Sequence, residues 1–223
     1  MTLSTNDLQE KYGFESPFKA DPLLKKALPY LKKSGKNLLD IGCGEGADTV
    51  FFAKKGFQVL AMDNNSDYLN RLKTFIQDQK LSNIIVENTN VINHPYPKNH
   101  YDIVNCLLVG CCMRRSEFEI MLESIKNTVK PKGIIIMSLR NYLDLEIEDL
   151  SLLTKKIEPN TYIKNGDCCA IRYYIEKDRL KNLFNDFEVL YYYEGLAADK
   201  YKEVTKHGDS YIICRKKEVS QNT

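Results

Sequence analysis

A chain of 223 residues fits one domain of ordinary size, and 43% hydrophobic with 28% charged residues is a globular composition rather than a disordered one. Thirty-two lysines and arginines against 30 aspartates and glutamates leave a net charge of +2, which gives no electrostatic footprint for nucleic acid. No apolar stretch approaches the roughly 20 residues of a membrane span, and the N-terminus lacks the pattern of a signal peptide. We therefore expect a cytoplasmic monomer or homodimer, with its seven cysteines as thiols and with neither a membrane nor a nucleic-acid partner.

Helical and strand-like periods alternate from about residue 20 to residue 140, which predicts a parallel sheet with helices on both faces. Asp21 followed by Pro22 predicts the start of a helix through Lys33, and Ser66 is the expected N-cap of a helix through Lys80. Further helices are expected at 47–55 and 118–129. The first five strands are predicted at 37–41, 57–62, 84–87, 101–109 and 134–139.

Beyond Arg140 the pattern is looser. Asn165-Gly166 between strand-like runs at 161–164 and 168–175 predicts a hairpin turn. After a short helix at 178–184, the runs 187–193 and 210–214 predict a closing antiparallel hairpin joined by a polar connection at 194–208. The expected fold class is α/β: a doubly wound, Rossmann-like, mostly parallel sheet of seven strands with an antiparallel C-terminal edge hairpin.

The segment Leu-Leu-Asp-Ile-Gly-Cys-Gly-Glu-Gly at residues 38–46 carries the most functional information. An apolar run ends there in Asp40, and glycines follow at alternate positions: Gly42, Gly44 and Gly46. A strand that ends at a glycine turn places bare backbone beside a ligand, because glycine has no Cβ. About 20 residues later a second apolar run ends in Asp63, where an acid accepts hydrogen bonds from the ribose of a nucleoside. The spacing differs from the dinucleotide fingerprint, Gly-x-Gly-x-x-Gly.

The stretch LLDIGCGEGADTVFFAKKGFQVLAMDNN, from Leu38 to Asn65, resembles motif I and the acidic strand end of class I S-adenosylmethionine-dependent methyltransferases. Tyr101-Asp102-Ile103-Val104 stands at the place of that family's fourth strand. The runs at 172–180, 187–196 and 214–217 are similar to the tellurite-resistance type of small methyltransferases. The resemblance implies S-adenosyl-L-methionine as cofactor. It also implies one domain over 1–223, made of lid helices (1–35), a cofactor-binding half (36–140), a substrate-side half (141–217) and a tail (218–223).

The resemblance also implies roles for single residues. The glycine loop lies under the methionine part of the cofactor, where Asp40 organises the turn and reaches the amino group and Glu45 could do so through water. Asp63 accepts from the ribose diol. Asn90 either stands where the family places an Asp on the adenine or is a loop side chain that caps its own turn. Tyr12 either folds over the cofactor or packs as a plain lid residue. The expected cofactor-binding set is Tyr12, Asp40, Gly42, Gly44, Glu45, Gly46, Asp63, Asn64, Asn90, Val91 and Leu107.

The end of the fourth strand, residues 107–112, is expected to face the transferring methyl group. The Asn/Asp-Pro-Pro-Tyr motif of amino-methylating enzymes and the carboxylate cage of magnesium-dependent enzymes are not recognisable, so no metal is expected. Cys111 and Cys112 are either inert packing residues or thiolates that bind a soft metalloid such as tellurite, selenite or arsenite. His207 is either a satisfied surface histidine or the base that takes a proton from the acceptor.

Four arginines could each hold an anionic acceptor or be solvated surface groups: Arg114, Arg115, Arg140 and Arg172. The His-Arg pair that tellurite-type members carry after the penultimate strand is not matched by residues 197–201. We expect a methyltransferase acting on a small-molecule acceptor, with a soft chalcogen or metalloid species as one candidate. The alternatives are a small-molecule O- or N-methyltransferase of metabolism, a methyltransferase of RNA or protein, and a cofactor-binding regulatory protein without turnover.

Overall fold

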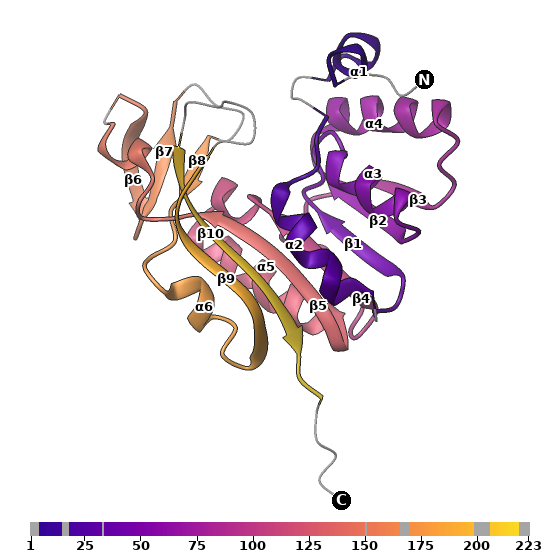
Figure 1. Ribbon diagram of the computed structural model, residues 1–223. Coiled ribbons are helices and arrows are strands. Elements are labelled where there is room, and N and C mark those ends of the chain that lie inside the picture. The colour runs from indigo at the N-terminus through magenta and orange to yellow at the C-terminus, as the bar shows by residue number, and fades with distance from the viewer. Residues whose placement is uncertain are drawn as a thin grey trace, which may run out of the picture.

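Figure 1 shows the computed structural model, which describes residues 5–14, 18–32, 34–149, 151–165, 170–198 and 206–218. The strands of its main sheet are β1 (Asn37–Ile41), β2 (Gln58–Asp63), β3 (Ile84–Asn88), β4 (Tyr101–Leu107), β5 (Val129–Arg140), β9 (Phe187–Ala198) and β10 (Lys206–Lys216). Within the described residues these seven strands lie in the order β3-β2-β1-β4-β5-β10-β9. The strands β1 to β5 are parallel, whereas β10 pairs antiparallel with β5 and β9. This arrangement confirms the predicted fold class.

Helices cover both faces of this sheet. They are α1 (Thr5–Tyr12), α2 (Pro22–Leu31), α3 (Ala47–Lys54), α4 (Ser66–Asp78), α5 (Arg115–Thr128) and α6 (Arg179–Asn182), with 3-10 turns η1 (Gly110–Cys112) and η2 (Leu145–Glu148). In Figure 1, α2 lies in front of the sheet and α5 lies behind it. In the described ranges, no helix combines the length and the apolar character needed to span a membrane.

The central strands are buried on both faces, because neighbouring side chains of a strand point to opposite sides. Leu38 packs with α2 and α3, whereas the next residue, Leu39, packs with α5. The same alternation continues in β5, where Ile134 lies on the α2 side and Ile135 on the α5 side. All four side chains are fully buried. Continuous apolar runs therefore predicted these strands well.

Two helix starts show where the local prediction is right and where it is wrong. The N-cap of α2 is Asp21 as predicted, since its Oδ1 accepts a hydrogen bond from the backbone N of Leu23 at 2.9 Å. The predicted cap Ser66 is wrong for α4. Asn65 caps that helix, because its Oδ1 accepts from the backbone N of Asp67 at 3.0 Å and of Tyr68 at 3.2 Å.

A second, antiparallel sheet is formed by residues that follow β5. It consists of β6 (Leu153–Glu158), β7 (Thr161–Lys164) and β8 (Ile171–Tyr173), in that order. The predicted pairing of the two later runs is confirmed, with Thr161 opposite Tyr173. Most of the expected turn lies outside the described residues. The first strand was missed because residues 154–156 are exposed and polar, so no apolar alternation marks them.

The closing hairpin is longer than its sequence pattern suggested. The stretch 194–208 was predicted as a polar connection, but β9 continues to Ala198 and β10 begins at Lys206. Lys206 pairs with Ala198, and His207 pairs with Ala197. The strand β9 lies at the edge of the sheet, where a strand needs only one buried face, so polar residues do not end it. The remaining residues, 199–205, lie outside the described ranges.

Candidate functional site

A cleft of about 420 Å³ opens at the carboxyl ends of the parallel strands. It lies where β1 has β2 on one side and β4 on the other, which is the switch point at which open α/β sheets bind ligands. Six of the predicted cofactor residues line it: Gly42, Asp63, Asn64, Asn90, Val91 and Leu107. In the part of the chain that is described, five predicted residues lie outside its lining: Tyr12, Asp40, Gly44, Glu45 and Gly46.

The three positions of the loop require glycine for different physical reasons. Gly42 and Gly44 adopt positive φ angles of 64° and 53°, which L-residues with a side chain rarely adopt. A Cβ on Gly42 would lie 2.3 Å from Val109 Cγ2, and one on Gly46 would lie 2.4 Å from Leu72 Cδ1. A Cβ on Gly44 would meet nothing within 4 Å. Packing therefore excludes side chains at the first and third glycines, whereas the middle one leaves open space beside the loop.

Asp63 holds this loop and also faces the cleft. Its Oδ2 accepts from the backbone N of Gly44 at 2.8 Å, and its Oδ1 accepts from the backbone N of Asn65 at 2.9 Å. A carboxylate has about four lone-pair positions, so each oxygen retains capacity for a second donor. A ribose diol supplies two such donors. The residues present therefore fit a nucleoside.

Asp40 lies beneath the loop and is only 1% exposed. Its Oδ2 accepts from Thr49 Oγ1 at 2.5 Å, and its Oδ1 accepts from Asn105 Nδ2 at 2.8 Å. These bonds connect β1 to α3 on one side and to β4 on the other. Contact between Asp40 and the cofactor stays a prediction.

Two other predicted residues brace the loop and α1 against α4. The hydroxyl of Tyr12 donates to Asp78 Oδ2 at 3.1 Å, and its ring packs edge-on against Phe75 at a centroid distance of 5.1 Å. Glu45 accepts from the Arg71 guanidinium at 3.0 Å. These are packing and pairing contacts, and cofactor contacts of Tyr12 and Glu45 stay predictions. Asn90 lines the cleft and also caps its own turn.

The cysteine pair lies in η1 at the far wall of the cleft. Cys112 lines the cleft, whereas Cys111 is fully buried and its thiol donates to the carbonyl of Leu108 at 3.0 Å. A hydrogen bond with Cys112 and burial raise the pKa of the Cys111 thiol well above its usual range, despite the nearby Arg172. Cys111 therefore stays a thiol at neutral pH. Residues 168–169, the second cysteine pair, lie outside the described ranges.

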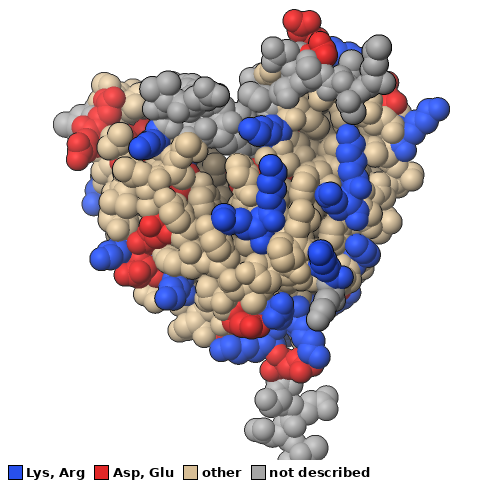
Figure 2. All heavy atoms as spheres, viewed as in Figure 1, with Lys and Arg blue, Asp and Glu red and all other residues tan. Residues whose placement is uncertain are grey.

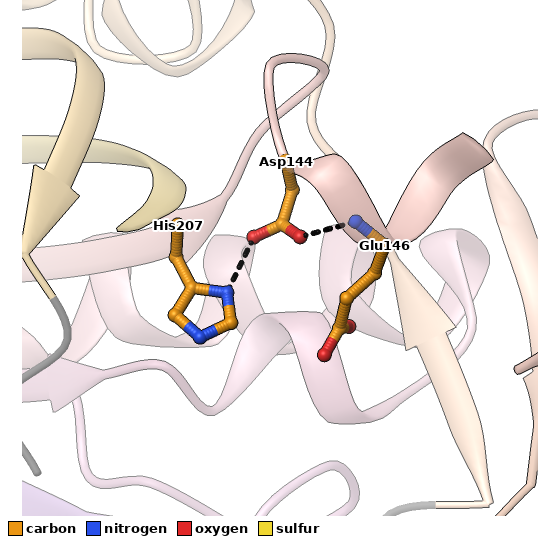
Figure 3. A group of neighbouring side chains, drawn as sticks. All are labelled: Asp144, Glu146 and His207. Atoms are coloured by element: carbon orange, nitrogen blue, oxygen red, sulfur yellow. Dashed lines mark hydrogen bonds and ion pairs between the residues drawn. The ribbon is translucent and has the colours of Figure 1, made fainter. Parts of the chain in front are cut away.

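His207 lies in a polar cluster with Asp144 and Glu146, shown in Figure 3. Its Nδ1 is 3.0 Å from Asp144 Oδ2, and the same oxygen accepts from the backbone N of Gly208 at 3.1 Å. Burial raises the pKa of Asp144, but the hydrogen bonds from His207 and the Glu146 backbone outweigh it and lower the pKa below its usual value. The histidine is outside the cleft lining, and its role as a base stays a prediction.

The same three side chains have ligand atoms within 4.8 Å of one another, a spacing that a metal site also shows. The carboxylate of Glu146, however, is 2.8 Å from Lys164 Nζ and accepts from the Tyr174 hydroxyl at 2.9 Å. Figure 3 shows dashed contacts from Asp144 to the His207 ring and to the backbone nitrogen of Glu146, and none to the Glu146 carboxylate. The geometry thus describes a cluster that joins η2 to β10 through protein contacts.

Two of the predicted arginines lie at the start of α5, away from the cleft. Arg114 is 3.8 Å from Glu158, and Arg115 is 2.9 Å from Glu176. Arg140 lies at the end of β5, beside the cleft, and Arg172 packs from β8 onto the cysteines of η1. Only the last two arginines therefore stand close to the site.

Leu108 and Val109 line the cleft, within the segment expected to face the methyl group, and several further lining residues were not predicted: Asn65, Tyr68, Ile92, Met113, Ala170 and Ile171. Most of them directly follow predicted residues at strand ends, so proximity in sequence was a usable signal. Ala170 and Ile171 come from the second sheet, and no local pattern connects them to the glycine loop. Leu108 adopts a φ of 57°, which is rare for a residue with a side chain and has no sequence signal here.

Comparison with known proteins gives a consistent result. A family model described as a methyltransferase domain matches residues 32–188. Glycine N-methyltransferase of Mus musculus is 27% identical over 122 residues, which are 47% of this chain and 40% of that protein. The (S)-coclaurine N-methyltransferase of Thalictrum flavum subsp. glaucum is 28% identical over 107 residues, 47% of this chain and 29% of that protein. The match thus covers less than half of each of these relatives.

Solved structures show the same fold over most of the chain. TehB from Haemophilus influenzae has a TM-score of 0.70 at 16% identity, over 96% of this chain and 67% of that one. An S-adenosylmethionine-dependent methyltransferase from Methanosarcina mazei has a TM-score of 0.69 at 17% identity, over 90% of this chain and 100% of that one. Identities this low establish the fold alone.

Proposed function

The chain belongs to the methyltransferase domain family, which implies S-adenosylmethionine as cofactor, and on that premise we propose that it methylates a small-molecule acceptor. The bound cofactor supplies a methyl group on a sulfonium, so the acceptor's lone pair forms the new bond in line while the carbon–sulfur pair returns to sulfur. Such a reaction needs mainly proximity and alignment from the protein. The protein therefore has to hold the cofactor and the acceptor in the correct relative position.

Asp63 is the observation that carries this proposal. It reaches the cleft from the end of β2, holds the glycine loop through Gly44 and keeps lone pairs for a ribose diol. Val91 and Leu107 supply apolar lining for a base and for the methyl-bearing end. The open space at Gly44 gives a ligand access to bare backbone.

An amine or hydroxyl acceptor is better supported than a soft metalloid. Soft centres bind thiolates, but the raised pKa keeps Cys111 protonated, and only Cys112 lines the cleft. Two of the relatives described above are named as N-methyltransferases, and one is named for glycine. A base is needed only if the acceptor arrives protonated, and the Asp144-oriented His207 is the candidate for that step.

The test is transfer of label from methyl-labelled S-adenosylmethionine to a panel of amines, phenols, carboxylates, tellurite and selenite, with the full chain. We expect transfer to at least one small amine or hydroxyl compound and its loss in Asp63→Ala. Asp67→Ala, an exposed change on α4, is the control. Tight cofactor binding without any transfer would instead support the regulatory alternative, and the absence of cofactor binding would overturn the proposal.

A further inference from the structure

A second cavity, of about 130 Å³, lies beside the cofactor cleft. Its walls come from α2, from the end of β5 and from the closing hairpin of β9 and β10. Leu108 belongs to the linings of both cavities. Its backbone N donates to Ser138, to the carbonyl at 3.0 Å and to Oγ at 3.1 Å, which fixes this residue between β4 and β5. The two cavities therefore meet at one well-held residue.

The polar end of the second cavity is a chain of three side chains. Arg140 donates from its guanidinium to Asp209 Oδ1 at 2.6 Å, and the hydroxyl of Tyr211 donates to Asp209 Oδ2 at 2.8 Å. Asp209 is 3% exposed. Burial and the Asp209 charge raise the pKa of Tyr211, which keeps this phenol protonated. Arg140 is thus held in place by a buried acid.

The hydrogen-bonding capacity that remains in this cavity belongs mainly to donors. Each oxygen of Asp209 already accepts one hydrogen bond, and Asp21 accepts from the backbone N of Leu23 through Oδ1, so the donors of Arg140 are the groups here that an anionic ligand would use. A guanidinium has five N–H donors in a planar fork. Arg140 uses one of them for its hydrogen bond to Asp209. An acceptor group with two oxygens, such as a carboxylate, matches that fork.

The lining carries two acids, Asp21 and Asp209, and two bases, Lys26 and Arg140, while the outer face around it is richer in basic residues. Lys26 of α2 lines it and lies over the Tyr191 ring, 5.3 Å from the centroid. Figure 2 shows that blue Lys and Arg side chains outnumber red ones on the face that carries α2, and that this face is hollowed beside the helix. A positive surround raises the local concentration of anionic ligands.

The size of the cavity limits what it holds. A volume of about 130 Å³ equals the share of roughly four water molecules in the liquid, at about 30 Å³ each. We propose that this cavity binds the methyl acceptor, and that Arg140 recognises a carboxylate or other oxyanion on that small molecule. The inference rests on the proposed function, because a methyl acceptor has to bind next to the cofactor cleft, and this cavity shares Leu108 with that cleft.

The experiment compares acids with their own amides, using glycine against glycinamide and lactate against lactamide, with tellurite as an inorganic oxyanion. We expect the parent to use an acid at least tenfold better in kcat/KM than its amide. Arg140→Met should lower kcat/KM for the acid by ten- to a hundredfold through KM and lower it for the amide by a much smaller factor. The affinity for S-adenosylmethionine, measured by calorimetry, should stay within twofold.

Two further variants keep the result interpretable. Arg140→Met/Asp209→Asn removes the charge that the single change would leave buried, and it should show the same loss of acid preference. Arg215→Met, which breaks an exposed pair with Glu188, is the matched arginine control and should behave as the parent. If the parent turns over none of these probes, binding of glycine and lactate to the parent is measured by calorimetry, and no binding overturns the proposal.

Each remaining outcome has one meaning. Equal use of acid and amide by the parent, or equal loss of both in Arg140→Met, would overturn the acceptor assignment while cofactor binding and turnover keep the proposed function intact. Weaker cofactor binding in Arg140→Met would instead assign the cavity to the cofactor and overturn the proposal. Arg140-dependent methylation of tellurite without use of the acids would identify an inorganic oxyanion as the source of the negative charge.

Discussion

The two halves of the site are built in opposite ways. The cofactor cleft is made from strand ends that follow one another along the chain, and its loop is held by Asp40 and Asp63 from β1 and β2. The second cavity gathers Asp21, Arg140 and Tyr211 from segments that are far apart in sequence. A local sequence motif can therefore determine which cofactor binds. The choice of acceptor would depend on residues that only folding brings together. The four predictions below test this division.

The largest effect is expected for Gly44→Val. A branched side chain would enter the open space beside the loop and would be strained at a φ of 53°, so cofactor binding should fall below detection in calorimetry. The protein should still fold, because a Cβ there meets nothing within 4 Å. Gly56→Val is a matched control with a φ of 83° and the same open space, and it should bind normally. Normal binding by both variants would mean that the loop is a turn and nothing more.

Asp63→Ala should weaken cofactor affinity by roughly ten- to a hundredfold, equivalent to about 1.5–3 kcal/mol for bonds to a charged group. Part of that loss would come through the loop, since Asp63 also accepts from the backbone N of Gly44. The acceptor preference measured for Arg140 should be unaffected in the same variant. Titration calorimetry measures the affinity of Asp63→Ala for the cofactor. An unchanged affinity would mean that the nucleoside binds elsewhere.

Asp144→Asn tests the contact between Asp144 and His207 through the pH dependence of the free energy of unfolding. The lowered pKa of Asp144 means that its carboxylate stabilises the folded state above the unfolded pKa, near 3.9, and that this stabilisation is lost as pH falls through the folded value. The variant should lose about 1–2 kcal/mol of unfolding free energy at pH 7, and the loss should shrink progressively as the pH falls below the unfolded pKa. Urea unfolding across this range measures it, with the exposed Glu148→Gln as control. A pH-independent difference would contradict the linkage.

The smallest effect is expected for Cys112→Ser. The thiol lines the cleft but the neighbouring Cys111 is a buried, protonated packing residue, so turnover of an amine or hydroxyl acceptor should stay within about twofold. Cofactor affinity should also be unchanged. A selective loss of tellurite or selenite methylation in this variant would revive the soft-metalloid hypothesis. Steady-state kinetics with both acceptor classes separates these results.

The sequence predicted the parts of this molecule that depend on local patterns. Buried strands such as β4 read as continuous apolar runs, and the glycine turn with Asp63 indicated the cleft from spacing alone. The strand β6 was not predicted, because its exposed residues show no alternation of apolar and polar side chains. The second cavity escaped for a different reason, since the pairing of Arg140 with Asp209 depends on the register of β5 against β10.

The hydrogen bonds of Asp40 affect the fraction of molecules that can bind the cofactor. The bonds of Asp40 to Thr49 and Asn105 are buried in the core of the sheet, and the part-buried bond of Asp63 to Gly44 is also made within the chain. The loop therefore takes its shape in the same cooperative event as the sheet. A larger share of the folded molecules is then competent to bind, and the apparent affinity is reduced less by loop conformers that cannot bind.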